Sequence, residues 1–178
     1  LCIDLGVNFL GFVFYEKSPR NLNLEDVQKL KTYDKQNSFF TAVTVDPTNE
    51  FIKRVVLEKF DYIQLHGSET SERVNEIKSM GIKVIKAIKI KNQSDLEKYK
   101  EYENADIILF DTPGMEKSIE FPRNLISKIP RGEKYALAGS ISQNNIENIA
   151  KLGVTFCDLS SSLELDTQIG YKDHSKIK

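Results

Sequence analysis

The sequence contains few of the residues that mark disulfide-rich or metal-binding proteins. It has only two cysteines, Cys2 and Cys157, in 178 residues. That is too few for a disulfide framework and is typical of a reducing compartment, so we predict a cytoplasmic protein. It also has only two histidines, His66 and His174, and neither has a cluster of further ligand types near it in the sequence. A metal site is therefore not expected.

The sequence also lacks an excess of charge of either sign, and it has no long apolar run. Lys and Arg total 25 against 26 Asp and Glu, a formal net charge of −1, which excludes a globally basic nucleic-acid binder. The apolar runs are strand-sized, far short of the ~20 residues that span a bilayer, and the chain does not open on a signal-peptide pattern. We expect neither a nucleic acid nor a membrane as partner. With 40% hydrophobic residues, the chain has enough apolar material for one folded domain.

What the sequence does contain is a regular alternation of strand-like and helix-like segments. Amphipathic stretches with helical spacing, such as Leu24–Tyr33 and Glu50–Phe60, separate the apolar runs. Seven runs are predicted to be strands: Phe9–Tyr15, Phe39–Val45, Tyr62–His66, Lys83–Ile90, Asp106–Asp111, Tyr135–Gly139 and Phe156–Ser161. Strands joined by helical crossovers predict a parallel sheet.

Two architectures fit this alternation, an open doubly wound sheet and a closed (β/α) barrel. Polar residues follow at least five of the strands, and barrels build their sites from many strand ends, so the pattern favours the α/β (β/α)8 TIM barrel. Eight strands are needed to close it, and the chain offers seven. Because Leu1–Gly6 reads as the end of a helix, we predict a single barrel domain over residues 1–178 whose first strand is missing, truncated at the N-terminus and also at the C-terminus.

Residues after the last two strands are candidates for a phosphate site. Gly139 and Ser140 allow the backbone to approach an anion, and Ser160–Ser162 add hydroxyl donors. Each group taken alone is more simply a turn or a helix cap. Their occurrence after adjacent late strands favours phosphate.

Asp111 ends an apolar strand, which would hold its carboxylate at the active end of a barrel; the alternative is a turn residue before Pro113. Arg20, in the loop after Tyr15, could hold a carboxylate with two parallel hydrogen bonds, although most loop arginines are simply solvated.

The other polar strand residues are more ambiguous. His66 is at a strand end, where packing roles are commoner than catalytic ones. Of Lys86 and Lys89, one could point into the barrel and pair with a carboxylate. Cys157 reads as a small core residue, but Asp158 beside it needs a partner.

Taken in order, these segments resemble phosphoribosylanthranilate isomerase, a (β/α)8-barrel family of tryptophan biosynthesis. The resemblance begins with Gly11–Tyr15 and Lys17–Arg20, which match the family's second strand and its loop. It continues in register through Val43–Pro47, Ile63–Gly67, Ile85–Ile88, Leu109–Thr112, Leu137–Gly139, Asp158–Ser161 and Gly170–His174. It covers nearly the whole chain.

The resemblance implies an Amadori rearrangement of N-(5′-phosphoribosyl)anthranilate to 1-(o-carboxyphenylamino)-1-deoxyribulose 5-phosphate, without cofactor or metal. The partner is this small phosphosugar–anthranilate substrate, and we expect a monomer. By resemblance Asp111 is the general acid and Arg20 holds the anthranilate carboxylate, while His66 lines the site. The remaining substrate-binding residues it implies are Asp158 and, for the phosphate, Gly139, Ser140, Ser160, Ser161 and Ser162.

The chain departs from the family pattern in three places. The family's general base is the cysteine of a Lys-x-Cys-Gly motif that these residues lack, and Cys2 is not its equivalent. The segment Thr112–Ser118 has no glycine-rich run, and Ser140 and Ser162 replace glycines. The alternatives left open are a phosphate-binding barrel without a base, and another phosphosugar enzyme such as a histidine-pathway isomerase or indole-glycerol-phosphate synthase.

Overall fold

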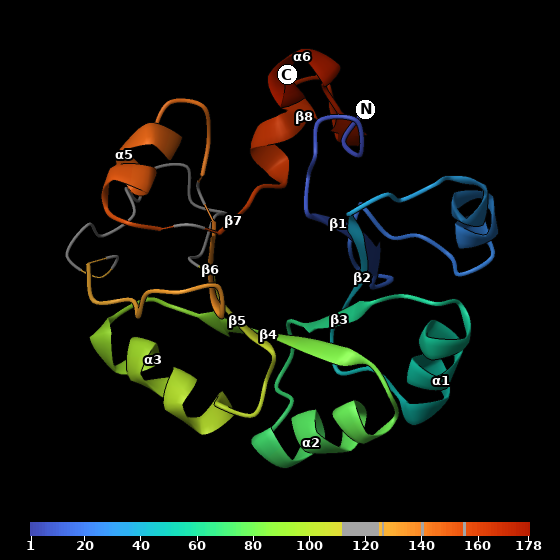
Figure 1. The fold of residues 1–178 in the computed structure, drawn as a ribbon, viewed down its shortest axis with the longest axis horizontal. Coiled ribbons are helices and arrows are strands. Elements are labelled where there is room, and N and C mark those ends of the chain that lie inside the picture. The colour runs from blue at the N-terminus through green and yellow to red at the C-terminus, as the bar shows by residue number, and fades with distance from the viewer. Residues whose placement is uncertain (112–124, 126, 140, 155) are drawn as a thin grey trace. The chain divides into compact units, whose positions relative to one another are not determined.

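The computed structural model describes residues 1–111, 125, 127–139, 141–154 and 156–178, and its residues form two compact units. Unit 1 comprises Leu1–Ile85 with Ile177–Lys178, and unit 2 comprises Lys86–Lys176. Each unit is described by itself. All seven predicted strands are present (Figure 1).

Unit 1 is built on three parallel strands, β1 (Phe9–Phe14), β2 (Phe39–Thr44) and β3 (Tyr62–Leu65). A 3-10 helix, η1 (Asp26–Thr32), follows β1, where the spacing predicted an ordinary helix. Helices α1 (Asn49–Leu57) and α2 (Ser71–Ser79) follow β2 and β3 (Figure 1). Strand β4 (Lys83–Lys89) begins in unit 1 and ends in unit 2.

Unit 2 contains the parallel strands β5 (Ile107–Asp111), β6 (Tyr135–Ala138) and β7 (Cys157–Asp158). Strand β7 is shorter than predicted. Between the strands lie α3 (Gln93–Glu97), η2 (Lys98–Tyr102) and α5 (Ile146–Lys151). After β7 come the 3-10 turn η3 (Ser161–Leu163), the antiparallel pair β8 (Glu164–Leu165) and β9 (Gln168–Lys172), and α6 (His174–Ile177).

The burial of the strands explains why their sequences are continuous apolar runs. All four residues of β3 are buried, as are the first four of β5, because parallel strands of this kind are covered on both faces. Ile52 and Val55 of α1, and Val74 and Ile77 of α2, are fully buried. Strand β1, by contrast, is only half-buried along most of its length.

Polar side chains and glycines mark the helix ends. The N-cap of α2 is Thr70, whose hydroxyl accepts from the Arg73 N–H. Asn92 caps α3 in the same way. Gly81 and Gly153 adopt the left-handed conformation after their helices, at φ +91° and +81°. Leu1–Gly6 forms hydrogen-bonded turns that end at Gly6, without a regular helix.

The two ends of the unit 1 strands have different chemistry. At the amino ends, the rings of Phe9, Phe39 and Tyr62 pack with centroids 5.1 to 5.5 Å apart. At the carboxyl ends lie His66, Asp46 and the polar loop that follows β3. In unit 1, polar side chains are therefore found at the carboxyl ends of the strands.

Candidate active site

Asp111 occupies the last position of β5, held on both sides by the sheet. Its carbonyl accepts a 2.8 Å hydrogen bond from the Ile90 N–H, and its register partner on β6 is Ala138. Ile107–Phe110 before it are buried, whereas Asp111 is half-buried. The apolar strand thus carries a carboxyl group to the point where the buried layer ends.

Asp158 lies in the same row of the sheet. Asp111 pairs in register with Ala138, and Ala138 pairs with Asp158 of β7. Because register partners of parallel strands project to the same face and neighbouring strands are about 4.8 Å apart, the two aspartates share a face about 10 Å apart at their Cα atoms.

These surroundings change the acidity of Asp111. The pKa of Asp111 is raised from 3.8 to about 6. Burial is the largest cause, the negative charge of Asp158 also raises the pKa, and the positive charge of Lys89 lowers it. With a pKa of about 6, a carboxyl group keeps its proton on about a tenth of the molecules at pH 7, whereas an ordinary aspartate does so on fewer than about one in a thousand. Lys89 is exposed and acts on Asp111 through its charge, so the prediction that one strand lysine points into the barrel and pairs with a carboxylate stays a prediction. Lys86 is buried, with its Nζ 5.5 Å from the centre of the Tyr102 ring.

Two segments of unit 2 were expected to bind phosphate. Gly139, directly after β6, has φ +87°, a conformation open to glycine but strained for most other residues; Ser140 lies outside the described residues. Ser160 and Ser161 are exposed, and the turn they begin is closed by a 3.2 Å bond from the Leu163 N–H to the Ser160 carbonyl.

The turn after β7 contains polar groups that have no hydrogen-bond partner within the described part of the chain. Within the described part of the chain, no residue accepts from the N–H groups of Ser161 and Ser162. The Ser162 hydroxyl is buried and has no hydrogen-bond partner there. Buried polar atoms without partners are uncommon in native proteins, and a bound ligand is one explanation for them.

His66, in unit 1, is tied to its own strand. Its Nε2 is 2.6 Å from the side-chain nitrogen of Gln64, two residues before it, and its backbone N–H donates to the Thr44 carbonyl. That arrangement suits a positioned lining group, although the role predicted for His66 stays a prediction.

Sequence reasoning missed a pair of carboxylates that fix the loop after His66. Glu69 is buried, and its Oε1 accepts from the N–H groups of Asp46, at 2.8 Å, and Gly67, at 3.2 Å. Asp46 Oδ1 accepts from the Ser68 N–H at 2.8 Å. Asp46 and Gly67 both lie inside segments that carry the family resemblance. Their charges face backbone groups, however, and that can only be seen in three dimensions.

Arg20 lies in the loop that follows β1. The loop folds back on itself, because the Leu22 N–H donates to the Val13 carbonyl and the Arg20 N–H to the Ser18 hydroxyl at 3.1 Å. Arg20 is half-buried. Its backbone is therefore held close to the carboxyl end of β1, as a ligand-binding role requires.

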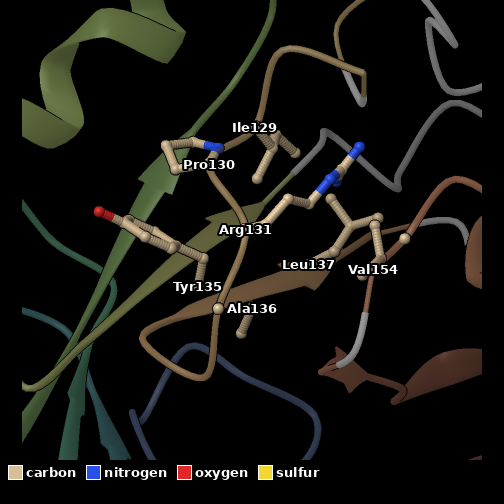
Figure 2. Close-up of a pocket in the computed structure, with 9 residues that line it drawn as sticks. Ile129, Pro130, Arg131, Tyr135, Ala136, Leu137 and Val154 are labelled. Carbon is tan, nitrogen blue, oxygen red and sulfur yellow. The ribbon is translucent and has the colours of Figure 1, made fainter.

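Unit 2 also contains a small pocket that is separate from Asp111. It is lined by Ile129–Gly132, Tyr135–Leu137, Gly153 and Val154, at the amino end of β6 (Figure 2). Asp111 and Ala138 are at the opposite, carboxyl ends of their strands. In barrels the amino ends serve stability, so we assign this pocket no catalytic role.

Two further properties of the described residues bear on ligands. They include no group of three or more His, Cys, Asp or Glu side chains placed to hold a metal ion. In the same part of the chain, no helix has the length and apolarity needed to cross a membrane.

Comparison with known proteins gives a consistent result. Residues 1–178 match the family model described as N-(5'phosphoribosyl)anthranilate (PRA) isomerase. The N-(5'-phosphoribosyl)anthranilate isomerase of Agrobacterium fabrum is 34% identical over 97% of this chain and 82% of its own length.

Solved structures agree with the sequence matches. Phosphoribosyl anthranilate isomerase from Thermotoga maritima superposes with a TM-score of 0.86 at 28% identity, over 98% of this chain and 86% of that one. A phosphoribosyl anthranilate isomerase in complex with reduced 1-(o-carboxyphenylamino)-1-deoxyribulose 5-phosphate gives a TM-score of 0.82 at 27% identity, with the same coverage. Because these neighbours are TIM barrels, the barrel is confirmed over the open sheet.

Proposed function

This chain belongs to the N-(5′-phosphoribosyl)anthranilate isomerase family, and we propose that Asp111 is the general acid of its reaction. The chain is an isomerase of tryptophan biosynthesis. It acts on N-(5′-phosphoribosyl)anthranilate, and the product is 1-(o-carboxyphenylamino)-1-deoxyribulose 5-phosphate.

The observation that carries the assignment is the acidity of Asp111. A general acid must hold its proton at the working pH, which an ordinary aspartate does not do. Burial at the end of β5 and the neighbouring charge of Asp158 raise its pKa to about 6. Asp111 then protonates the furanose ring oxygen as the bond from that oxygen to C1′ breaks, and the substrate nitrogen supplies the electron pair that forms the Schiff base.

The second half of the reaction needs a base. Removal of the C2′ proton places the electron pair in an enolamine, with the nitrogen of the Schiff base as the electron sink, and the enolamine tautomerises to the ketone. We assign this proton transfer to neither cysteine of the chain. Burial and the charge of Asp158 raise the pKa of Cys157, which disfavours its thiolate, and Cys2 lies in the turns before β1. In the family that these residues resemble, the base is the cysteine of a Lys-x-Cys-Gly motif, which residues 1–178 do not contain.

Each end of the substrate has its own binding groups in the proposal. In unit 1, Arg20 holds the anthranilate carboxylate and His66 lines the site. In unit 2, Asp158 hydrogen-bonds the sugar, and the phosphate is bound by Gly139, Ser140, Ser160, Ser161 and Ser162. Among the described residues, none accepts from the N–H groups of Ser161 and Ser162 in the turn after β7, and this supports the phosphate assignment.

We also propose that the enzyme is a cytoplasmic monomer. Two cysteines that form no disulfide support a reducing compartment. Sedimentation of the purified protein tests the monomer, and a dimer would overturn it.

Exchange of the acid for an amide tests the mechanism. Asp111→Asn should lower kcat by about 10²–10⁴. It should leave the affinity for the reduced product analogue within about threefold, because the amide can still hydrogen-bond but cannot donate an acidic proton. Turnover within threefold of the unsubstituted protein would exclude Asp111 as the acid. Binding of the analogue with no turnover by the unsubstituted protein would instead favour a phosphate-binding barrel without a base.

A further inference from the structure

Lys172 makes two contacts that tie the end of β9 to the turn after β7. Its Nζ is 2.7 Å from the Ser160 carbonyl oxygen and 3.3 Å from Oε1 of Glu164. Glu164 and Lys172 are register partners in the antiparallel β8–β9 pair, so they face each other directly. The resemblance includes Lys172, but no role was predicted for it.

Burial of Glu164 keeps Lys172 in one position. The Glu164 side chain is only 6% exposed, against 40% for Lys172. A carboxylate so far from water needs a charged or hydrogen-bonding partner, which keeps the Lys172 ammonium beside it. An ammonium has three N–H donors, and one of them is left to point at the Ser160 carbonyl.

The Ser160 carbonyl is also the group that closes the turn. It accepts from the Leu163 N–H at 3.2 Å as well as from Lys172, and the Asp173 N–H donates to the Leu163 carbonyl at 2.8 Å. Thus the residues at the end of β9 hold both the first and the last carbonyl of the turn. The N–H groups of Ser161 and Ser162, which point the opposite way in a 3-10 turn, stay available.

We propose that Lys172, held in place by Glu164, is a positioning residue that fixes the Ser160–Leu163 turn in the conformation that binds the substrate phosphate. This rests on the proposed function, because the turn is the phosphate site assigned there. Lys172 acts through the Ser160 carbonyl and does not touch the substrate. The buried Ser162 hydroxyl, unpaired within the described residues, supports a ligand at the same turn.

The experiment compares substitutions of two lysines near the same hairpin. Lys172→Met keeps the side-chain length and removes the ammonium, and Lys172→Arg keeps the charge. Lys176→Met is the matched control, because Lys176 Nζ bonds Asp166 and the Glu164 carbonyl, each at 2.7 Å, and makes no contact with Ser160. The readouts are the KM and kcat of the isomerase and the dissociation constant of inorganic phosphate, measured by calorimetry on the full chain.

We expect Lys172→Met to raise both KM and the phosphate dissociation constant by at least about tenfold, since a hydrogen bond to a charged group is lost. The value of kcat should stay within about twofold, because the acid is not involved. Lys172→Arg should recover part of the loss, and Lys176→Met should match the unsubstituted protein. A loss of kcat without a change in phosphate affinity would overturn the proposal, as would equal effects of Lys172→Met and Lys176→Met.

A second variant guards against a folding failure. Glu164→Gln keeps the shape of the side chain and releases the ammonium from its anchor, so it should weaken phosphate binding in the same direction but less. If the unsubstituted protein neither isomerises its substrate nor binds phosphate, the proposed function fails. If it does both and neither Lys172→Met nor Glu164→Gln weakens phosphate binding, only the role of Lys172 fails.

Discussion

The loops after β3 and after β7 are both fixed by charged side chains that bond to the backbone, but the charges have opposite sign. In unit 1 the carboxylates of Asp46 and Glu69 accept from three backbone N–H groups. In unit 2 the ammonium of Lys172 donates to a backbone carbonyl. The choice of charge decides which backbone groups remain for a ligand.

Each arrangement suits a different part of the substrate. Carboxylates in unit 1 occupy the N–H groups of Asp46, Gly67 and Ser68, which removes them as donors to an anion and adds negative charge. The cation in unit 2 occupies a carbonyl and leaves the N–H groups of Ser161 and Ser162 available. This difference supports the proposal that the phosphate binds at the turn after β7. We propose that the loop after β3 instead positions His66.

The largest effect we expect comes from removing the carboxylate of unit 1. Glu69→Ala removes two hydrogen bonds from backbone N–H groups, those of Asp46 and Gly67, to a charged carboxylate, and each such bond contributes about 1.5–3 kcal/mol to the folding free energy. Glu69→Gln keeps one acceptor oxygen and should cost less, because a bond to a neutral group is about half as strong. Urea unfolding gives the free energies.

Ser68→Ala is the control for this loop. Ser68 takes part through its backbone N–H, which alanine keeps, so its stability should stay within about 0.5 kcal/mol of the unsubstituted protein. If Glu69→Ala is as harmless as Ser68→Ala, the carboxylates do not hold the loop.

A second test asks whether unit 1 recognises the anthranilate carboxylate. Arg20→Ala should weaken binding by about 10–150-fold, the value of a charge-assisted hydrogen bond. A ligand without that carboxylate should bind both forms equally. Arg131→Ala, at the amino end of β6, is the control and should change neither affinity. Equal losses for both ligands would mean that Arg20 acts on loop structure.

A third, smaller effect concerns stability and pH. Asp111 has a folded-state pKa of about 6 against 3.8 for the ordinary side chain, so the folded protein binds more protons between these values. Its contribution to stability is complete below about pH 3.8 and is lost as the pH rises through about 6. Asp111→Asn should therefore become more stable relative to the unsubstituted protein from pH 4 to pH 7. The stability of both proteins is measured by thermal melting at each pH. A difference in melting temperature that stays constant from pH 4 to pH 7 would contradict the raised pKa.

The smallest effect separates the two charges around Asp111. Asp158→Asn removes a negative neighbour and should lower the pKa of Asp111, whereas Lys89→Met removes a positive one and should raise it. The alkaline limb of the kcat/KM profile, which reports the acid of the free enzyme, should move to lower pH in the first and to higher pH in the second. Lys91→Met, a nearby exposed lysine, is the control. Shifts in the same direction would exclude this account of the Asp111 acidity.

The local sequence determined the strands, the α/β class and the positions of the candidate site residues. Each strand is a short run whose apolar composition is a local property, so Ile107–Phe110 predicted both β5 and the polar end of the strand at Asp111. The helical period also predicted α1, but it could not distinguish an α-helix from the 3-10 helix η1, because the two differ in backbone hydrogen bonding.

Tertiary structure alone decided which charges meet. Register places Asp111, Ala138 and Asp158 in one row, although 46 residues lie between the two aspartates in the sequence. The bonds from Lys172 to Ser160 and from Asp46 to Glu69 join segments that no periodicity connects. The period of a strand or helix fixes which face a side chain takes, while its partners depend on strand pairing and loop closure, and the acidity of Asp111 follows from those partners.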